Sequence, residues 1–318
     1  MFINGASQSM NNISNQFHSF PAPAKLNLFL HIIGQRNDGY HQLQTMFQFL
    51  DHSDTLDIKL TEGLNIELLT PIVGVLNEDN LIVKAAQLLQ NYIIENKILD
   101  KSVNNVEKKL GAQIKVTKIL PMGGGLGGGS SNAATILLAL NVLWQANLTL
   151  SELSQLGLSL GADVPIFIHG FSAFAEGVGE ELTPVYPKEN WFLVSKPNVS
   201  ISTASVFTSP CLTRNTPKVN LCDDISKLDM DLCHNDCQSL VIKKYPEVAK
   251  LLAWLVEYAP SRMTGTGACI FSRFDTEQEA CRIQSLLPKG IMSFVAKGVN
   301  TSPLRNVINN LVTSHKSN

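Results

Sequence analysis

Runs in which apolar and polar residues alternate predict β-strands in both halves of the chain. They cover residues 26–33, 55–60, 65–69, 112–120, 192–194, 269–274 and 291–297. Successive side chains of a strand point to opposite faces of a sheet, so this pattern is typical of half-buried strands. The Arg-Asn-Asp-Gly sequence at residues 36–39 follows the first run and predicts a turn.

Apolar residues at helical spacing predict helices between these strands. The pattern covers residues 80–94, 132–145 and 240–258, and Pro246 is a candidate start within the last range. Thr149 and Glu152 fit a capping box for a further helix that ends near Gly161. Asp275 is expected to cap a helix before the last strand. The mixed order of strands and helices favours an α+β fold over a regular βαβ alternation.

The length of 318 residues is close to the size at which one core divides into two. Residues 170–187 are rich in Gly and Pro and form the expected seam. We therefore predict a loose N-terminal tail over residues 1–20, an N-terminal domain over 21–183 and a C-terminal domain over 184–318. Residues 97–109 are polar and predict a loop or a helix end.

The composition is that of a globular protein with balanced charge. The chain has 25 basic and 27 acidic residues, a net charge of −2, and 44% hydrophobic residues. This balance argues against a polyanion-binding surface, so no nucleic-acid partner is expected. No stretch of 18 apolar residues and no basic, apolar leader occurs, so we expect a cytoplasmic protein without a membrane partner.

All six cysteines lie after residue 210, which excludes a small disulfide scaffold. Cys233 and Cys237 flank a histidine, but their spacing matches no common zinc pattern and no second ligand pair follows. We therefore expect buried or incidental thiols and no dedicated metal site.

Residues 121–134, Pro-Met-Gly-Gly-Gly-Leu-Gly-Gly-Gly-Ser-Ser-Asn-Ala-Ala, carry the strongest chemical signal. Six glycines within seven residues leave the backbone N–H groups unobstructed and allow positive φ angles. Ser130 and Ser131 add hydroxyl groups, and an apolar helix is predicted to follow. The N-terminus of a helix favours anions through its free N–H groups and its dipole. The segment is therefore predicted to bind nucleotide phosphates.

Other interpretations of the glycines are weaker. A Walker phosphate loop needs Gly-Lys, a dipeptide that occurs nowhere in the chain. A dinucleotide-binding fold, as in oxidoreductases, fits Gly-x-Gly-x-x-Gly but needs an acidic residue about 20 positions later. No charged residue occurs between Pro121 and Ser151. A flexible linker is disfavoured because a predicted strand and helix flank the loop closely.

Three segments resemble the motifs of the GHMP kinase superfamily, which includes galactokinases, homoserine kinases and mevalonate kinases. They are residues 23–28, 121–134 and 264–271, in the order found in the family. The resemblance implies a two-domain α+β fold with the active site in the cleft between the domains. It makes the N-terminal, ATP-binding domain ribosomal-protein-S5-like and the C-terminal domain a ferredoxin-like α/β sandwich.

Further segments resemble one branch of this superfamily, whose acceptor is a cytidine-diphosphate-linked methylerythritol. They are residues 24–28, 36–41, 161–165, 214–217, 234–237 and 297–300. The resemblance implies transfer of the γ-phosphate of ATP, with Mg²⁺, to a 2-hydroxyl of this small molecule on the non-mevalonate route to isoprenoid precursors. We expect a monomer or a weak homodimer. The departures are modest, since Gly124 and Asn132 stand where Ala and Asp are common.

The resemblance also assigns roles to individual residues. It makes Asp163 the general base and Lys25 its stabilising cation. The nucleotide-binding residues that it implies are Asn80, Pro121, Met122, Gly123, Gly124, Gly125, Leu126, Gly127, Gly128, Gly129, Ser130 and Ser131. The substrate-binding residues that it implies are Asn27, Tyr40, His41, Thr203, Phe207, Gly265 and Gly267. Of these, Tyr40, His41 and Phe207 are expected to hold the cytosine.

The residues themselves support part of this assignment. Lys25 opens an apolar strand, where an unpaired charge is costly to bury. Asn27 lies two residues further, on the same face of that strand. Without the resemblance, Asp163 would be an ordinary helix-terminal carboxylate and Lys25 a solvent-facing residue at a strand end.

Two other functions stay open at this point. One is another GHMP kinase with homoserine or mevalonate as acceptor, against which residues 39–41 and 161–165 argue. The other is a non-catalytic nucleotide-binding or RNA-associated module, because the N-terminal half of the superfamily shares its fold with a ribosomal protein domain. The presence of Lys25 and Asp163 and the near-zero net charge argue against it.

Overall fold

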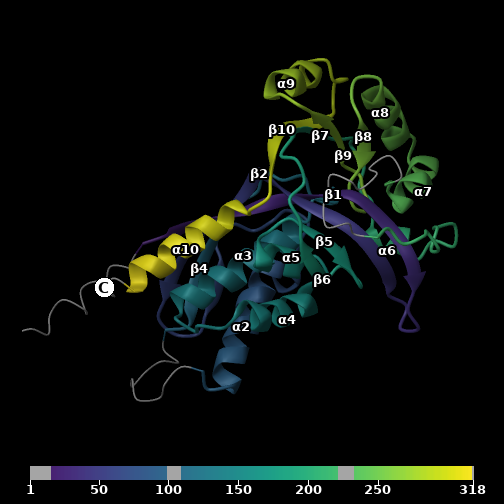
Figure 1. Cartoon of the computed structure of the whole chain (residues 1–318). Helices are drawn as coiled ribbons and strands as arrows, with labels where there is room; N and C mark the ends of the chain where they lie inside the picture. Colours follow the sequence, from purple (N-terminus) through teal and green to yellow (C-terminus); the bar gives the residue numbers. More distant parts are fainter. Residues whose placement is uncertain (1–15, 99–108, 221–232, 317–318) are drawn as a thin grey trace, which may run out of the picture.

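The computed structural model describes residues 16–98, 109–220 and 233–316 of the chain. Two long antiparallel strands run through the molecule, β1 (His18–Gln35) and β2 (His41–Thr61). The predicted turn joins them, with the Arg36 N–H donating to the Tyr40 carbonyl over 2.7 Å. In Figure 1 this hairpin crosses the molecule and reaches both of its lobes.

The described strands form one mixed sheet. Its order is β3–β4–β2–β10–β7–β9–β8, with β1 and β5 also paired to β2, and β6 paired to β5. The bounds are β3 (Ile66–Leu68), β4 (Gly111–Thr117), β5 (Ala173–Glu176), β6 (Glu181–Pro184), β7 (Trp191–Lys196), β8 (Ser261–Met263), β9 (Ile270–Phe274) and β10 (Met292–Val299). Strand β10 joins the two halves, because its C-terminal end pairs with β2 and the rest pairs with β7.

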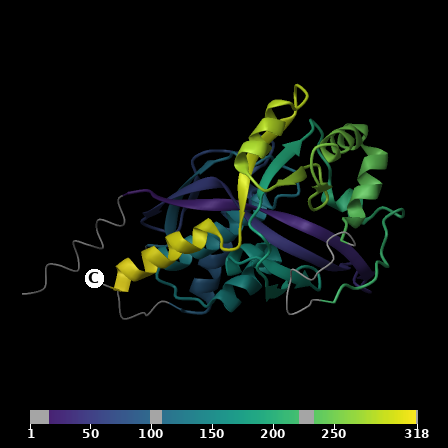
Figure 2. The same ribbon diagram turned by 45° about the horizontal axis from the view of Figure 1, so that its top comes forward.

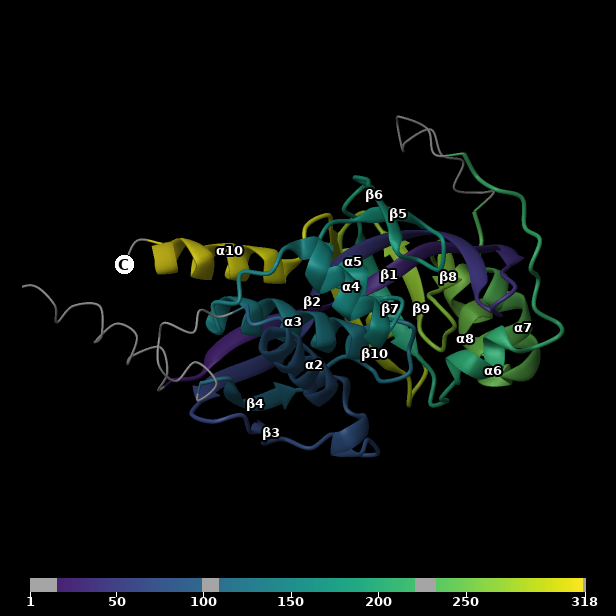
Figure 3. The same cartoon turned by 90° about the horizontal axis from the view of Figure 1, so that it is seen from below.

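Helices gather in two groups. The N-terminal lobe comprises β1 to β6 with α2 (Leu81–Glu95), α3 (Gly128–Leu143), α4 (Leu150–Leu160), α5 (Val164–His169) and α10 (Pro303–Lys316). The C-terminal lobe comprises β7 to β10 with α6 (Thr203–Phe207), α7 (Asp236–Lys244), α8 (Pro246–Val256) and α9 (Glu277–Ser285). A short 3-10 turn, η1 (Asn77–Asp79), precedes α2. Figures 2 and 3 show α10 at one end of the molecule and the α7–α8 pair at the other.

Each lobe has its own apolar core. Helix α3 is buried on nearly all sides, as expected of a central helix, and packs with Phe49 and Leu56 of β2. The second core is built around α7, α8 and β9, and β1 contributes Leu30 and Ile32 to it. A third cluster, which includes Leu26 and Phe192, lies between the two and joins the lobes.

The α+β class and most predicted elements are confirmed. The predicted strands all appear, and the capping box of Thr149 and Glu152 starts α4 as expected. Strand β1 begins at His18, inside the predicted tail, because residues 18–20 pair with β2. Residues 1–15 of that tail and 99–108 of the predicted loop lie outside the described residues.

Three helix boundaries differ from the prediction. Helix α3 begins at Gly128, four residues early, because Gly127 in a left-handed conformation serves as its N-cap. The pattern over residues 240–258 covers two helices that meet at Tyr245, whose extended backbone is favoured by the following Pro246. The candidate start at Pro246 is confirmed for the second helix. Thr276 rather than Asp275 caps α9, since the Thr276 hydroxyl accepts the Glu279 N–H.

The chain does not divide cleanly at the predicted seam. Residues 170–187 contain the β5–β6 hairpin, which pairs with β2 of the N-terminal lobe. Helix α10 follows β10 in sequence but packs against β1 and α3. The boundary between residues 183 and 184 therefore stays a prediction. None of the described helices is long and apolar enough to cross a membrane.

Leu137→Ala tests the packing of α3. Leu137 is fully buried, so its truncation leaves a cavity and is expected to lower the free energy of unfolding by about 2–5 kcal/mol. Chemical denaturation followed by circular dichroism measures the loss. Leu158→Ala is the matched control, because Leu158 is exposed and its truncation is expected to cost under about 0.5 kcal/mol. Equal losses in the two variants would contradict this packing.

Candidate active site

The glycine loop (residues 121–127) lies between β1 and the turn that precedes β9. On one side the Lys25 N–H donates to the Leu126 carbonyl over 3.1 Å. On the other side the Cys269 N–H donates to the Gly124 carbonyl over 3.1 Å. The loop is therefore fixed by backbone hydrogen bonds from both lobes.

Close packing explains why glycine is needed within the loop. Gly123, Gly125 and Gly127 have φ angles of +61°, +77° and +72°. A Cβ on Gly125 would lie 2.2 Å from the Thr264 carbonyl oxygen, and one on Gly127 would lie 2.8 Å from the Phe167 ring. Both positions therefore combine a left-handed backbone with a space that no side chain fits.

The first turn of α3 opens into the same region. No side chain caps this helix, and no acidic residue lies in its first turn. Gly128, Gly129 and Ser130 of that turn line a cavity with a volume of about 970 Å³. The helix thus presents its N-terminal N–H groups and the positive end of its dipole to the cavity, an arrangement that favours phosphate.

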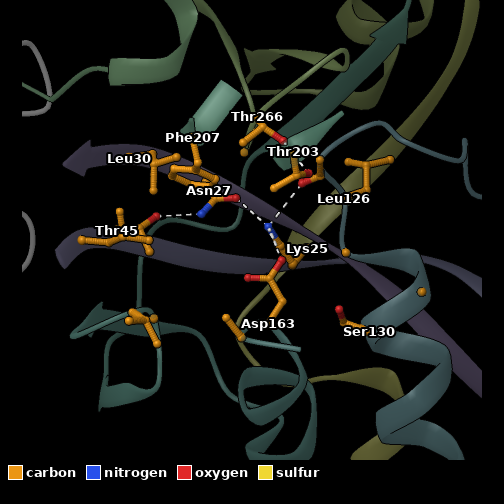
Figure 4. A pocket seen from close by; sticks show the side chains of 18 of the residues that line it. Lys25, Asn27, Leu30, Thr45, Leu126, Ser130, Asp163, Thr203, Phe207 and Thr266 are labelled. Carbon is orange, nitrogen blue, oxygen red and sulfur yellow. Dashed lines mark hydrogen bonds and ion pairs between the residues drawn. The ribbon is translucent and has the colours of Figure 1, made fainter. Parts of the chain in front are cut away.

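Lys25 lies at the centre of this cavity. Its Nζ is 3.2 Å from Asp163 Oδ2 and 2.6 Å from Asn27 Oδ1, and it donates to the Gly125 carbonyl over 3.2 Å. The ammonium also lies 5.2 Å from the centre of the Phe47 ring. Lys25 is only 2% exposed, so these partners replace water around a buried charge. Figure 4 shows Lys25 between Asn27 and Asp163.

Asn27 is held in one orientation. Its Nδ2 donates to Thr45 Oγ1 over 2.9 Å, which leaves Oδ1 to accept from the Lys25 ammonium. The backbone N–H of Asn27 donates to Thr264 Oγ1 over 2.9 Å, a contact between the lobes. The amide therefore fixes the position of Lys25 from β1.

Asp163 owes its position to the turn between α4 and α5. It occupies the N-cap position of α5, but its side chain makes no capping hydrogen bond. The carboxylate instead pairs with Lys25 and is 36% exposed toward the cavity. A carboxylate that is partly exposed and held in place by a cation can accept a proton from a bound hydroxyl group.

The far end of the cavity is aromatic. The His41 and Phe207 rings lie with their centroids 5.1 Å apart, and exposed Tyr40 lines the cavity beside them. Arg214 Nε donates to His41 Nε2 over 2.9 Å, and Arg214 Nη2 donates to the Phe207 carbonyl over 2.9 Å. We call Tyr40, His41, Phe207 and Arg214 the aromatic end. Figure 4 shows Phe207 and Ser130 on opposite sides of the Lys25–Asp163 pair.

Family models and curated relatives agree on the kind of protein. The models of the GHMP kinases N terminal domain and the GHMP kinases C terminal domain match residues 80–171 and 220–289. A 4-diphosphocytidyl-2-C-methyl-D-erythritol kinase of Colwellia psychrerythraea is 62% identical, covering 96% of this chain and 97% of the relative. The chain belongs to the GHMP kinase family. A kinase of the same name from Shewanella loihica is 54% identical, covering 92% of this chain and 97% of the relative.

Solved structures of GHMP kinases share the fold. A crystal structure of a 4-(cytidine 5'-diphospho)-2C-methyl-D-erythritol kinase has a TM-score of 0.73 at 27% identity, covering 88% of this chain and 99% of that chain. A mevalonate kinase structure has a TM-score of 0.63 at 15% identity, covering 89% and 99%, and shows the fold alone. The family and fold predicted from the three motifs are therefore confirmed.

This GHMP kinase gathers most of its predicted site residues around the cavity. Those that line it are Lys25, Asn27, Tyr40, His41, residues 121–130, Asp163, Thr203, Phe207 and Gly265. Three predicted residues do not line it. Asn80 caps α2, its Oδ1 accepting the Ile82 N–H over 3.0 Å. Ser131 is fully buried within α3, and Gly267 closes a turn by donating to the Thr264 carbonyl.

Some cavity residues had no role in the sequence analysis. They include Thr45, Phe47, Lys118, Val178, Gly179, Arg214 and Thr266. Arg214 stood in a recognised motif, and Lys118 is the cation nearest before the glycine loop, so the sequence held a signal for both. Thr45 and Phe47 reach the cavity only because β2 pairs with β1, and no local signal marks them.

Gly124→Ala tests the contact beneath the loop. A Cβ on Gly124 would lie 2.4 Å from the Sγ of fully buried Cys269, so the loop must shift. We expect a loss of about 1–3 kcal/mol in the free energy of unfolding, with weaker ATP binding. Cys269→Ala removes the clashing sulfur and is expected to restore most of both losses in the double variant. Additive losses, measured by denaturation and calorimetry, would contradict this geometry.

Arg214→Gln is expected to raise the pKa of His41. Burial first, and the Arg214 guanidinium second, hold the pKa of the His41 imidazole below its ordinary value. Removing the cation removes one of these causes, so His41 is expected to take up its proton at a higher pH. An NMR titration of ¹⁵N-histidine-labelled protein measures the pKa. Arg282→Gln, at an exposed site on α9, is the control, and an unchanged His41 pKa would count against the contact.

Proposed function

We propose that this chain transfers the γ-phosphate of ATP to the 2-hydroxyl of 4-diphosphocytidyl-2-C-methyl-D-erythritol. The name of the relatives that are 62% and 54% identical supports this acceptor. The observation that carries the proposal is the Lys25–Asp163 pair, which lies between the glycine loop and the aromatic end of one cavity. The site for ATP, the general base and the site for the phosphate acceptor would therefore lie next to one another.

In this proposal Asp163 is the general base. It accepts the proton of the acceptor hydroxyl while that oxygen attacks the γ-phosphorus, and ADP leaves with the electrons of the broken P–O bond. Phosphoryl transfer depends mainly on positioning and on charge stabilisation, so little covalent chemistry is asked of the protein. The Lys25 ammonium holds the Asp163 carboxylate in position and lies near the charge that develops on the transferred group.

The phosphates of ATP would bind at the glycine loop and at the first turn of α3. Mg²⁺ is expected to accompany them and to supply neutralisation of their charge. Among the described residues no group of three or more His, Cys, Asp or Glu side chains could hold a metal ion. The Ser130 side chain at the cavity wall fits Mg²⁺ as a single oxygen donor, because this ion keeps most of its ligands as water and phosphate oxygens.

The acceptor would bind with its cytosine ring at the aromatic end. Tyr40 and Phe207 offer rings on which a cytosine can stack, and such contacts are worth about 1–3 kcal/mol each. Asn27 and Thr203 also line the cavity and would contact the polyol. Gly265 brings backbone close to the path of the diphosphate.

The competing functions fit the cavity less well. Homoserine and mevalonate contain no nucleobase, so an enzyme for either would leave the aromatic end without a ring to bind. A non-catalytic nucleotide-binding module would have no use for a carboxylate paired with a buried ammonium. A cytoplasmic location and a monomeric or weakly dimeric state stay predictions of the sequence.

Asp163→Asn tests the base and the acceptor together. The amide cannot accept the hydroxyl proton, so we expect acceptor-dependent ADP release to fall by about 10²–10⁴-fold. A coupled assay with Mg-ATP, with and without 4-diphosphocytidyl-2-C-methyl-D-erythritol, measures the rate. Asp275→Asn is the matched control, because Asp275 is exposed and pairs with Lys188 on the surface.

Competition and alternative acceptors complete this test. CMP is expected to inhibit, because only a site for a cytidylyl group responds to it. ADP release with mevalonate or homoserine but not with the cytidylyl acceptor would overturn the proposed substrate. Full activity in Asp163→Asn would leave the kinase standing and remove Asp163 from its role.

A further inference from the structure

A buried carboxylate lies where the chain enters the glycine loop. Asp54 of β2 is fully buried, and its Oδ1 accepts the Ile119 N–H over 2.8 Å and the Leu120 N–H over 2.9 Å. These two residues directly precede Pro121, the first residue of the loop. Asp54 thus fixes the direction in which the backbone leaves β4.

The other carboxylate oxygen belongs to a closed polar cluster. Asp54 Oδ2 pairs with the Lys118 ammonium and accepts from Asn132 Nδ2 over 3.1 Å. Asn132 Oδ1 in turn accepts from Lys118 Nζ over 3.0 Å. Each of the three side chains is therefore bonded to the other two.

The three residues come from elements that bracket the loop. Lys118 precedes it, Asn132 lies in α3 just after it, and Asp54 belongs to the sheet beneath. Lys118 also lines the cavity beside the first turn of α3. A Cβ built on Gly128 would lie 3.5 Å from the Lys118 Nζ. Both ends of the loop are thereby tied to one carboxylate.

The donor and acceptor roles of the three side chains allow only one pattern of hydrogen bonds. Lys118 can only donate and Asp54 can only accept, so the amide of Asn132 must donate to one and accept from the other. Burial of such a pair is weak evidence for stability, because desolvation offsets much of the attraction. Its geometric effect is clearer, since breaking one contact leaves a buried group without its partner.

We propose that Asp54, Lys118 and Asn132 form a positioning triad that holds the glycine loop and the Lys118 ammonium in the geometry that binds the nucleotide phosphates. The triad supplies two things: a carboxylate in contact with the Lys118 ammonium, and an oxygen at position 54 that accepts the Ile119 and Leu120 N–H groups. This inference rests on the proposed use of ATP and adds residues that act on its binding rather than on the acceptor.

Exchange of the carboxylate and the amide tests the triad directly. Asp54→Asn alone deprives Lys118 of its counter-charge, and Asn132→Asp alone sets two carboxylates against each other. The double variant Asp54→Asn/Asn132→Asp returns a counter-charge to Lys118 from position 132. It also keeps the anchor before the loop, because the amide oxygen introduced at position 54 can accept the Ile119 and Leu120 N–H groups. The amide nitrogen at that position can then donate to the new carboxylate at position 132, which accepts from Lys118. Only the direct contact between position 54 and Lys118 is lost, because both groups would be donors.

ATP binding is measured by isothermal titration calorimetry without acceptor, and the KM values for ATP and for the acceptor by the coupled assay. Each single variant is expected to weaken ATP binding about tenfold or more, by the loss of one partner of a buried charged contact. The KM for the acceptor is expected to change less than about twofold. The double variant is expected to bind ATP at least about threefold more tightly than either single variant, but more weakly than the wild type, because one contact of Lys118 is lost.

Asn141→Asp is the matched control. Asn141 is another buried asparagine of α3, bonded through both amide atoms to the Leu148 backbone and distant in sequence from the loop. The same substitution there is expected to lower the melting temperature without changing ATP binding. If Asp54→Asn does not fold, Asn132→Asp and the double variant still decide the question.

Two results would overturn the triad. One is ATP binding in the folded single variants as strong as in Asn141→Asp. The other is a double variant that regains wild-type stability but binds ATP as poorly as the single variants. Wild-type protein that binds ATP but phosphorylates no acceptor would sink the proposed function and leave the triad standing. Wild-type protein that binds no ATP would overturn both.

Discussion

Burial of the Lys25 ammonium is the constraint on which the active site depends. An ammonium at 2% exposure is stable only with oxygen partners, and three different segments supply them. Asp163 comes from the turn before α5, Asn27 from β1, and the Gly125 carbonyl from the glycine loop. A displacement of any one segment would leave the charge partly unpaired. The interaction therefore couples the position of Asp163 to the position of the glycine loop.

The same constraint explains how a run of glycines can form a defined site. An unfolded glycine run has more conformational freedom than any other sequence, and ordering it at the moment of binding would weaken affinity. Here β1 holds the loop at Leu126, and the turn before β9 holds it at Gly124. Asp54 fixes the backbone just before the loop, through the Leu120 N–H. The loop is thus ordered by folding, and the directions of its N–H groups are set by contacts within the chain.

Local signals predicted the elements well, and long-range contacts account for what they missed. Thr149 and Glu152 act within one turn of helix, so their capping box was visible in the sequence. Either Asp275 or Thr276 could have capped α9, and only the backbone conformation decides between such neighbours.

The candidate site divides in the same way. The glycine loop and the Lys25–Asp163 pair were named from motifs, and the structure brings them together. The contact of Arg214 with His41 spans 173 positions, and that of Asp54 with Lys118 spans 64. No periodicity or spacing reports contacts of this range, because they arise only when the sheet and its connecting segments assemble.

The two lobes are interleaved, and this topology determines the conformation of the glycine loop. Strand β10 pairs with both β2 and β7, β1 contributes to the cores of both lobes, and α10 returns to the N-terminal lobe. A hinge between two independent domains would leave the glycine loop in contact with one of them at a time. In this topology the loop contacts β1 and the turn before β9 simultaneously, so its conformation depends on how the lobes are joined. Residues that fix the join therefore also fix the conformation of the glycine loop, although they lie outside the cavity.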